Sequence, residues 1–403
     1  MEHLLGRNPA VLSALRGMPV CEELIREYAI EKPFANHTPL LNTHVTVEDA
    51  IAALALYEGG ARDVVLGSTS YGTDKQVYDL LKEARVPVFA KPKGEARISE
   101  EKCRVFMEAA FSAFPIDGMI DDGGRYPQLL SACGSQLGKG VIGVVEQTRG
   151  GENCWQELFG KVLPIPVISA NESPFKKIEH KATAKTVVSA SLSAIKGQFA
   201  GKTIAVIGFG DIGREISLLI MQNHGARIIV VDTDNTKLVE AFQLGCGIDT
   251  KKNAIRKADV IITSTGKLNV IAKNDFSRLK DGCILINSGR YGEIDVESLE
   301  QMTREKHTIR GEPESVTEYL IAARKGHKSI YVVACSFPVN LYVGSGNPKE
   351  VLDLIFALML ECLAYIYKHH KKLKNKLLPA PQACIKKISN MFLKVHGYPP
   401  KSG

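Results

Sequence analysis

The sequence has no CxxC pair and no zinc-site spacing, although it contains nine cysteines. We therefore expect no metal, no disulfide framework, and a reducing, cytoplasmic location with most thiols buried. The N-terminus has no signal-peptide h-region. The longest apolar stretch, residues 351–367, is interrupted by Asp353 and Glu361. It predicts a core helix and no membrane span.

Acidic residues are missing from the C-terminal end of the chain. Residues 368–403 contain nine lysines, which leaves 42 basic and 44 acidic residues in 1–367, so the body of the protein is nearly neutral. A nucleic-acid-binding protein would need its basic surface on the folded body, so we expect no nucleic-acid partner. Residues 368–403 are predicted to form a basic C-terminal tail.

Helix-like segments and short apolar segments alternate from Val47 onward. This alternation is typical of mainly parallel sheets covered by helices, and 403 residues suffice for about two domains. We predict an α/β protein with two doubly wound lobes and a cleft between them. The first lobe is predicted to cover 1–183, completed by about 345–367, and the second to cover 184–344.

A glycine-rich turn lies between a predicted strand, 203–207, and a predicted helix, 214–224. The turn consists of Gly208, Phe209, Gly210, Asp211, Ile212 and Gly213, and Asp232 ends the next strand. This is the pattern of a Rossmann NAD-binding domain, in which the glycines admit the pyrophosphate and the aspartate accepts ribose hydroxyls. The acidic residue would repel a 2′-phosphate, which favours NAD over NADP. The alternative is a strand-turn-helix unit that binds nothing.

Polar residues follow two further strands of the second lobe. Thr263, Ser264 and Thr265 come after one strand, and Asn287 ends another. The carboxyl ends of parallel strands line the cofactor crevice in such folds, so these residues are predicted to contact ribose and nicotinamide. Ordinary turn formation is the alternative explanation.

Several motifs in one order resemble the S-adenosylhomocysteine hydrolase family. The cofactor loop GKTIAVIGFGDIG is one of them. The others, over residues 40–360, are His-Val-Thr-Val-Glu at 44–48, Asp-Asp-Gly-Gly at 121–124, Glu-Gln-Thr at 146–148, Asn-Glu-Ser before Lys176, Val-Asn-Leu at 339–341 and Gly-Asn-Pro at 346–348.

The resemblance implies an NAD-dependent enzyme with a nucleoside-type substrate, a substrate domain in the first lobe, and a homodimer or homotetramer. In that family NAD oxidises the substrate's 3′-hydroxyl, and the ketone acidifies the C4′ proton. The C5′ group then leaves by elimination, water adds, and the hydride returns. A neighbouring carbonyl makes such a proton removable by a base of modest strength.

The resemblance also implies a role for each matching residue. Asp122 would exchange the C4′ proton, Lys176 would take the 3′-hydroxyl proton, and His44 would assist at C5′. The binding roles would fall to Glu146 for ribose hydroxyls, Thr46 and Glu48 for adenine, and Asn340 for nicotinamide.

Other positions depart from the family pattern. His180 and Lys181 stand where the family has Asp-Asn, and Asn347 stands where it has histidine. We keep His180 as a catalytic candidate and Asn347 as a substrate-binding candidate. Three further departures are the new arginines Arg125, Arg149 and Arg290. They would suit an anionic or more polar substrate if they point inward, and would otherwise be solvated. Thr69 and Asp74 also depart from the family pattern.

The C-terminal segment allows two alignments. Lys394 and Tyr398 have the Lys-x-x-x-Tyr spacing of an arm that, in the family, reaches the neighbouring subunit's cofactor. In the alignment that we favour, Leu378 and Pro379 begin the helix before that arm, and the chain ends before the arm.

We therefore predict an adenosylhomocysteinase-like enzyme that acts on a nucleoside or nucleoside thioether. A nucleoside dehydratase or hydratase and a nucleoside dehydrogenase are alternatives with altered substrates. A catalytically dead NAD-binding regulator is a further alternative. The retained Asp122 and Lys176 argue against it, because such a protein needs neither.

Overall fold

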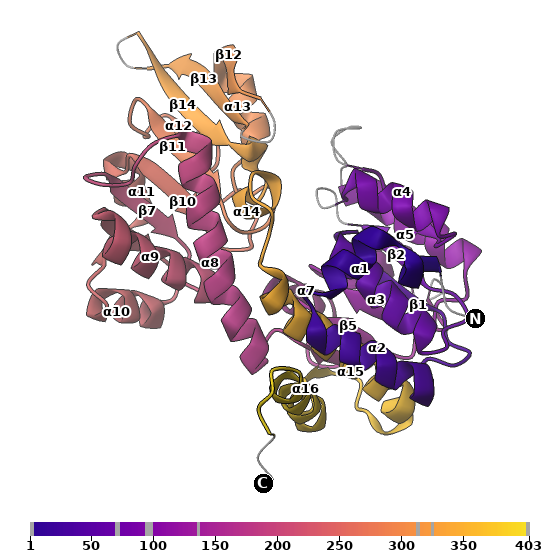
Figure 1. The fold of residues 1–403 in the computed structure, drawn as a ribbon. Helices are drawn as coiled ribbons and strands as arrows, with labels where there is room; N and C mark the ends of the chain where they lie inside the picture. The colour runs from indigo at the N-terminus through magenta and orange to yellow at the C-terminus, as the bar shows by residue number, and fades with distance from the viewer. Residues whose placement is uncertain are drawn as a thin grey trace. The chain divides into compact units, whose positions relative to one another are not determined.

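The chain folds into two compact α/β units. The computed structural model describes residues 4–68, 73–92, 100–134, 138–311, 315–323 and 326–399. Unit 1 comprises residues 1–177 and 348–403, and unit 2 comprises residues 178–347 (Figure 1). The two predicted doubly wound α/β lobes are confirmed. No helix in the described part of the chain is long and apolar enough to cross a membrane.

Unit 1 is built on a seven-stranded sheet in the order β15-β6-β5-β4-β1-β2-β3, and all its pairs are parallel. Its register sets Asp121 opposite both Asn42 and Glu146. The strands are β1 (Pro39–Thr43), β2 (Val65–Ser68), β3 (Val88–Phe89), β4 (Gly118–Asp121), β5 (Val144–Glu146), β6 (Val167–Ser169) and β15 (Leu377–Pro379).

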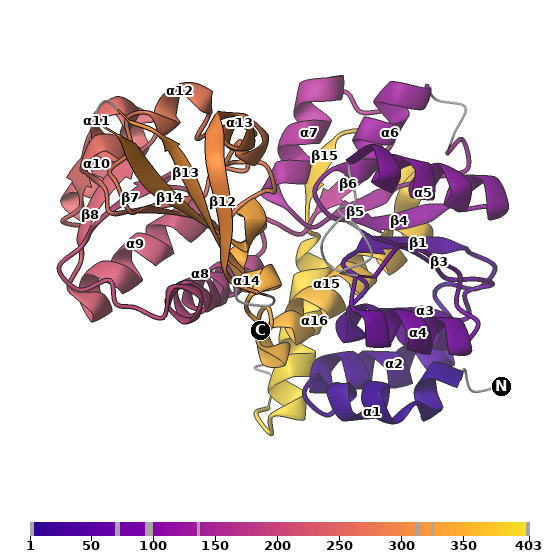
Figure 2. The same cartoon turned by 90° about the horizontal axis from the view of Figure 1, so that it is seen from above.

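Helices cover both faces of this sheet, and Figure 2 shows them as two layers. One face packs against α5 (Glu100–Ala113), α6 (Arg125–Cys133) and α7 (Arg149–Phe159), around the buried Tyr126 and Trp155. The other face packs against α1 (Pro9–Leu15), α2 (Pro19–Glu31), α3 (Val47–Glu58), α4 (Lys75–Glu83), α15 (Lys349–His369) and α16 (Gln382–Val395).

The basic C-terminal segment is part of the folded unit. β15 extends the sheet beside β6, and α16 buries Cys384, Ile388 and Met391 in the unit 1 core. Lys394 Nζ lies 2.6 Å from Glu23 Oε1 on α2, within the same unit. Tyr398 is exposed. A strand as short as β15 carries no periodicity, so charge alone suggested a tail.

Unit 2 contains an eight-stranded sheet in the order β12-β13-β14-β11-β10-β7-β8-β9. The strands β14, β11, β10, β7, β8 and β9 are mutually parallel, in the order of a doubly wound dinucleotide-binding sheet, and β12 and β13 add an antiparallel edge. The strands are β7 (Thr203–Ile207), β8 (Arg227–Val231), β9 (Gly247–Ile248), β10 (Val260–Thr263), β11 (Cys283–Asn287), β12 (Thr303–Arg310), β13 (Val316–Ala322) and β14 (His327–Val333).

Alternate residues of these strands face two separate cores, as the period of two requires. One core packs against α8 (Pro174–Ile195), α9 (Asp211–His224) and α10 (Asn235–Gln243). The other packs against α11 (Lys251–Lys257), α12 (Lys273–Phe276) and α13 (Val296–Met302) (Figure 2). A short helix, α14 (Val339–Tyr342), follows β14.

Candidate functional site

Polar side chains gather at the carboxyl edge of the unit 1 sheet. His44 directly follows β1, Asp122 follows β4, and Glu146 ends β5, and these three strands are neighbours. Because the strands are parallel, their carboxyl ends meet at one edge. Segments about 80 and 100 residues apart in the chain therefore contribute to one site.

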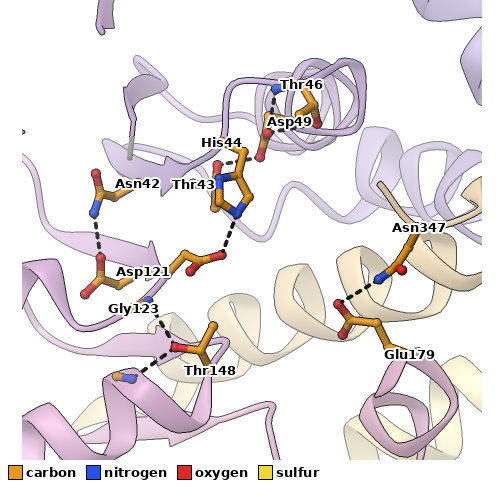
Figure 3. A network of polar contacts seen from close by, with 12 residues as sticks. Asn42, Thr43, His44, Thr46, Asp49, Asp121, Gly123, Thr148, Glu179 and Asn347 are labelled. Atoms are coloured by element: carbon orange, nitrogen blue, oxygen red, sulfur yellow. Dashed lines mark hydrogen bonds and ion pairs between the residues drawn. The ribbon is translucent and has the colours of Figure 1, made fainter. Parts of the chain in front are cut away.

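His44 and Asp122 form an ion pair at the centre of this edge. His44 Nε2 lies 3.3 Å from Asp122 Oδ2 (Figure 3). Burial opposes the charged imidazole, but the carboxylate of Asp122 prevails and raises the pKa of His44. Burial likewise opposes ionisation of Asp122, but the charges of His44, Lys176 and Arg125 hold its pKa below the usual value. Asp122 is therefore an ionised carboxylate among cations.

The adjacent Asp121 has a different environment. It is fully buried, and its carboxylate accepts hydrogen bonds from Asn42 Nδ2 at 2.6 Å and from the Tyr126 amide at 2.9 Å. Burial raises the pKa of Asp121 to about 6. Asp121 thus anchors the start of α6 to β1, whereas Asp122 is the carboxylate that faces the cations.

Hydrogen bonds from the described residues occupy one carboxylate oxygen of the buried Glu146 and leave the other oxygen open, that is, without a partner. Its Oε1 accepts hydrogen bonds from the Thr148 amide at 3.0 Å, the Thr148 hydroxyl at 2.9 Å and the Gly123 amide at 3.3 Å. Its Oε2 has no hydrogen-bond partner among the described residues. Burial raises the pKa of Glu146 well above its usual value. The open oxygen suits a hydroxyl-bearing ligand, since buried polar groups are normally paired.

Glycines make room for this arrangement. A Cβ at Gly151 would lie 2.0 Å from the Glu146 carboxyl carbon. Gly123 and Gly124 have φ angles of 79° and 69°, in the left-handed region that favours glycine. Val45, next to His44, also has a positive φ of 53°, which strains a β-branched residue. Such strain clusters at functional sites.

Thr46 and Glu48 lie at the start of α3. Asp49 accepts hydrogen bonds from the Thr46 amide at 2.8 Å and from the Thr46 hydroxyl at 3.1 Å (Figure 3). The Thr43 hydroxyl also donates to Asp49. Glu48 is buried. Asp49 was missed, although the Thr-x-x-Asp spacing at 46–49 is that of a capping box and could have identified it. Its side chain joins β1 to α3.

Lys176 is 5% exposed, on the first turn of α8. Its amide donates to Ser173 Oγ at 3.2 Å, and its charge acts on Asp122.

Arg149 is an ion-pair partner of Glu152, at 2.8 Å, and of Glu172. The positive charge of Arg149 is therefore balanced within unit 1.

The other departures occupy different places. Arg125, the first residue of α6, is half-buried, and its charge acts on His44 and Asp122. Asp74 caps α4 by accepting from the Val77 amide at 3.0 Å. Thr69 lies outside the described residues.

The glycine-rich turn of unit 2 has the geometry that its motif predicts. Gly208 has a φ of 97°, and a Cβ there would lie 2.4 Å from the Ser264 carbonyl oxygen. A Cβ at Gly213 would lie 2.0 Å from the Gly208 carbonyl oxygen. A Cβ at Gly210 would meet no atom within 4 Å. Gly208 and Gly213 are required by the packing of the protein itself. Gly210 instead leaves space in front of α9, which begins with Asp211 and Ile212.

Asp232 directly follows β8 and holds the same turn. Its carboxylate accepts hydrogen bonds from the Phe209 amide at 2.6 Å and the Asp234 amide at 2.9 Å. The Asn287 amide group is engaged within unit 2: its Nδ2 donates to the carbonyls of Arg290 and Ser336, both at 2.7 Å.

The remaining polar residues at this edge are linked to Asn287. The Thr263 hydroxyl donates to Asn287 Oδ1 at 3.2 Å, and Pro338 forms a β-bridge with Asn287. The bridge brings α14 to the end of β11. Asn340, on α14, is buried, and its Oδ1 has no hydrogen-bond partner among the described residues.

These observations fit NAD. Gly210 leaves a cradle at the N-terminus of α9, which suits a pyrophosphate, and Asp232 offers a carboxylate for ribose hydroxyls. The open Asn340 oxygen can accept from the carboxamide of a nicotinamide.

His180 and Asn347 both contact elements of unit 2. His180 Nδ1 lies 3.5 Å from Oδ2 of Asp211, the first residue of α9. Asn347 Nδ2 donates to Thr183 Oγ1 at 2.9 Å. It also donates to Glu179 Oε1 at 3.4 Å (Figure 3). Within unit 2, His180 therefore lies beside the cofactor turn, and Asn347 joins the end of the unit to α8.

Unit 2 has the fold and the loop of an NAD-binding domain, and unit 1 carries a carboxylate–histidine–lysine site. Residues 183–345 match the family described as S-adenosyl-L-homocysteine hydrolase, NAD binding domain. The adenosylhomocysteinase of Thermotoga maritima is 31% identical, with 94% of this chain and 92% of that protein covered. The adenosylhomocysteinase of Thermoplasma acidophilum is 30% identical, with coverage of 94% and 91%. The S-inosyl-L-homocysteine hydrolase of Methanopyrus kandleri is also 30% identical, with coverage of 94% and 88%.

The chain therefore belongs to the adenosylhomocysteinase family. It is an NAD-dependent enzyme of the hydrolase type.

Proposed function

We propose that this enzyme cleaves a purine nucleoside thioether at C5′ by transient oxidation at C3′ and removal of the C4′ proton. The observation that carries the proposal is the ionised Asp122, paired with His44 at 3.3 Å and influenced by the charge of Lys176. A carboxylate can remove a C–H proton only when a neighbouring carbonyl acidifies it and the carboxylate is unprotonated. Bound NAD would supply the oxidation that creates this carbonyl.

The residues of unit 1 divide the remaining work. Glu146 forms hydrogen bonds with the ribose hydroxyls through its open oxygen and so fixes the sugar relative to Asp122. Lys176 receives the 3′-hydroxyl proton as a neutral amine, and the ammonium formed in this way is the cation that acts on Asp122 in the C4′ step. Asp122 takes the C4′ proton, and His44 delivers a proton to the leaving group at C5′ and later accepts one from water. The raised pKa of His44 suits the first of these two steps, because the imidazole enters it charged.

The relatives support two alternatives for the base of the nucleoside. Relatives at 30–31% identity are named adenosylhomocysteinase in some organisms and S-inosyl-L-homocysteine hydrolase in another. Thr46 and Glu48 are the residues proposed to face the base, and Asn347 remains a proposed substrate contact. A homodimer or homotetramer and a cytoplasmic location also remain predictions.

The test compares three substrates on the purified, NAD-loaded protein. S-adenosylhomocysteine and S-inosylhomocysteine are each incubated with the enzyme, and free homocysteine thiol is measured. Adenosine is the third substrate, and the near-ultraviolet absorbance of NADH is followed. Thiol release from one thioether supports the proposal and identifies the base. Steady NADH accumulation without thiol would indicate a dehydrogenase, and neither signal with any nucleoside would refute the enzymatic proposal.

A further inference from the structure

A completely buried carboxylate, Glu293, joins two loops of unit 2. It lies between β11 and α13 and is 0% exposed. Its Oε1 accepts hydrogen bonds from the amides of Gly266 at 2.7 Å and Arg290 at 3.0 Å. Its Oε2 accepts from the amide and the hydroxyl of Thr265, both at 3.0 Å. One side chain therefore fixes the turn after β10 and the turn after β11.

The surrounding chain is built around this carboxylate. A Cβ at Gly289 would lie 1.9 Å from Glu293 Oε1, so the turn after β11 has no room for a side chain there. The Glu293 carbonyl accepts from the Ile271 amide at 3.0 Å, which ties the loop to the segment after β10 from a second side. The hydrogen bonds of Glu293 and the close approach of Gly289 to its carboxylate together hold both turns in one conformation.

Burying a carboxylate in the protein interior is costly unless hydrogen bonds or charges compensate it. Burial raises the pKa of Glu293, and the hydrogen bonds from Thr265, Gly266 and Arg290 oppose that shift. Ordinary turn-forming residues could shape either loop separately without a buried charge. A buried charge that binds two loops at once points to a need for their exact relative placement.

The position of the two turns identifies what they serve. In a doubly wound sheet, the two halves each take one mononucleotide. Gly208 and Asp232 belong to the β7–β8 half, which takes the adenosine end. Thr265 and Arg290 follow β10 and β11, in the half that takes the nicotinamide end. The open oxygen of Asn340 lies on α14, next to the end of β11.

We propose that Glu293 is a positioning residue for the nicotinamide half of NAD, because it fixes the turns at 264–266 and 288–290 in the conformation that receives that half. The proposal depends on NAD binding by unit 2 and not on the substrate chemistry of unit 1. Its failure and a failure of the proposed reaction are therefore distinguishable by binding alone.

The test measures the affinities of the full-length protein for NAD and for ADP-ribose by equilibrium dialysis. ADP-ribose keeps the adenosine, pyrophosphate and second ribose but lacks nicotinamide. Glu293→Gln keeps the size of the side chain but turns an NH₂ group toward backbone donors. We expect it to weaken NAD binding by about 10- to 100-fold, the usual effect of losing hydrogen bonds to a charged group. The affinity for ADP-ribose should stay close to that of the unchanged protein.

The matched control is Asp259→Asn. Asp259 also accepts a strand amide, that of Thr203 at 2.8 Å, but it precedes β10 at the amino edge of the sheet, opposite the turns. This variant should bind both ligands normally. Equal losses for NAD and ADP-ribose in Glu293→Gln, or no loss for NAD, would overturn the proposal.

A second variant covers the case in which Glu293→Gln does not fold, which circular dichroism would show. Glu293→Asp keeps the charge on a shorter side chain and should recover part of the NAD affinity. Bound NADH gives a further readout, because its fluorescence reports the surroundings of the nicotinamide ring. That fluorescence should change in both variants and remain normal in Asp259→Asn. Unchanged fluorescence and NAD affinity in Glu293→Asp would also count against the proposal.

Discussion

His44 Nε2 and Asp122 Oδ2 lie 3.3 Å apart at the carboxyl edge of the unit 1 sheet, and each residue stabilises the charged form of the other. The pair joins the ends of β1 and β4, which neighbour each other in the sheet although about 80 residues separate them in the chain. A base and a proton donor are thus held side by side.

This pairing predicts the pH dependence of C4′ proton exchange. Asp122 must be ionised to take the proton, and its pKa is held below the usual value, so exchange should persist into acidic solution. His44→Gln removes one of the cations responsible. The pKa of Asp122 should then rise, and the acid limb of the rate profile should move to higher pH. Nuclear magnetic resonance in deuterated buffers measures the exchange.

A second histidine–carboxylate pair provides the control for this profile. His37 Nδ1 lies 2.8 Å from Asp117 Oδ2, but both residues precede their strands at the amino edge of the same sheet. His37→Gln should leave the acid limb where it is. An acid limb that does not move in His44→Gln would contradict the assigned role of the pair.

The cofactor turn predicts different effects for two glycines. Gly210→Ala should leave the fold intact, because the new Cβ meets no protein atom within 4 Å. It should nevertheless weaken NAD binding by about 10-fold or more, because the space in front of α9 is meant for the pyrophosphate. Gly213→Ala places a Cβ 2.0 Å from a backbone oxygen and should lower the melting temperature as well. Normal NAD affinity in Gly210→Ala would refute this account of the turn.

Asp232 predicts the choice between NAD and NADP. Its carboxylate repels a 2′-phosphate, so Asp232→Ala should raise the affinity for NADP relative to NAD by about 10-fold or more. Because the Phe209 and Asp234 amides lose their acceptor, absolute affinity for NAD should fall too. Asp234→Ala removes a nearby charge from the same segment and should leave the preference unchanged. Competition between the two cofactors measures the ratio.

Substitutions on α7 can test the role of Glu146 as a nucleoside ligand. Gly151→Ala places a Cβ 2.0 Å from the Glu146 carboxyl carbon and should displace that side chain. We expect a stability loss of about 1–3 kcal/mol from overpacking and a weaker affinity for nucleosides. The neighbouring Gly150→Ala has its nearest contact at 4.0 Å and should be neutral in both measurements. Equal nucleoside affinity in the two variants would argue against Glu146 as the ribose ligand.

The sequence was informative where structure follows from local pattern. The alternation of helices and apolar strands predicted both sheets, and the glycine turn predicted the cofactor unit. The motifs shared with the family pointed to Asp122 and Glu146. β15 was missed because three residues carry no periodic signal, and the lysines around it dominated the composition.

Residues that act across the fold could not be found in this way. Asn42 and Glu293 are ordinary polar residues in the sequence, and their importance comes from the groups they hold in three dimensions. Asn287, the last residue of β11, has a role within the fold that the sequence could not show, because its amide group donates to the carbonyls of Arg290 and Ser336. Its contact with the cofactor stays a prediction.

The central claim is that Asp122 removes the C4′ proton after oxidation at C3′. The most direct measurement incubates the NAD-loaded Asp122→Asn variant with the thioether that the unchanged enzyme cleaves, in deuterated water. NADH absorbance should still appear, because oxidation does not need Asp122. Incorporation of deuterium at C4′ should fall by about 100-fold or more. Incorporation at the unchanged rate would contradict the claim.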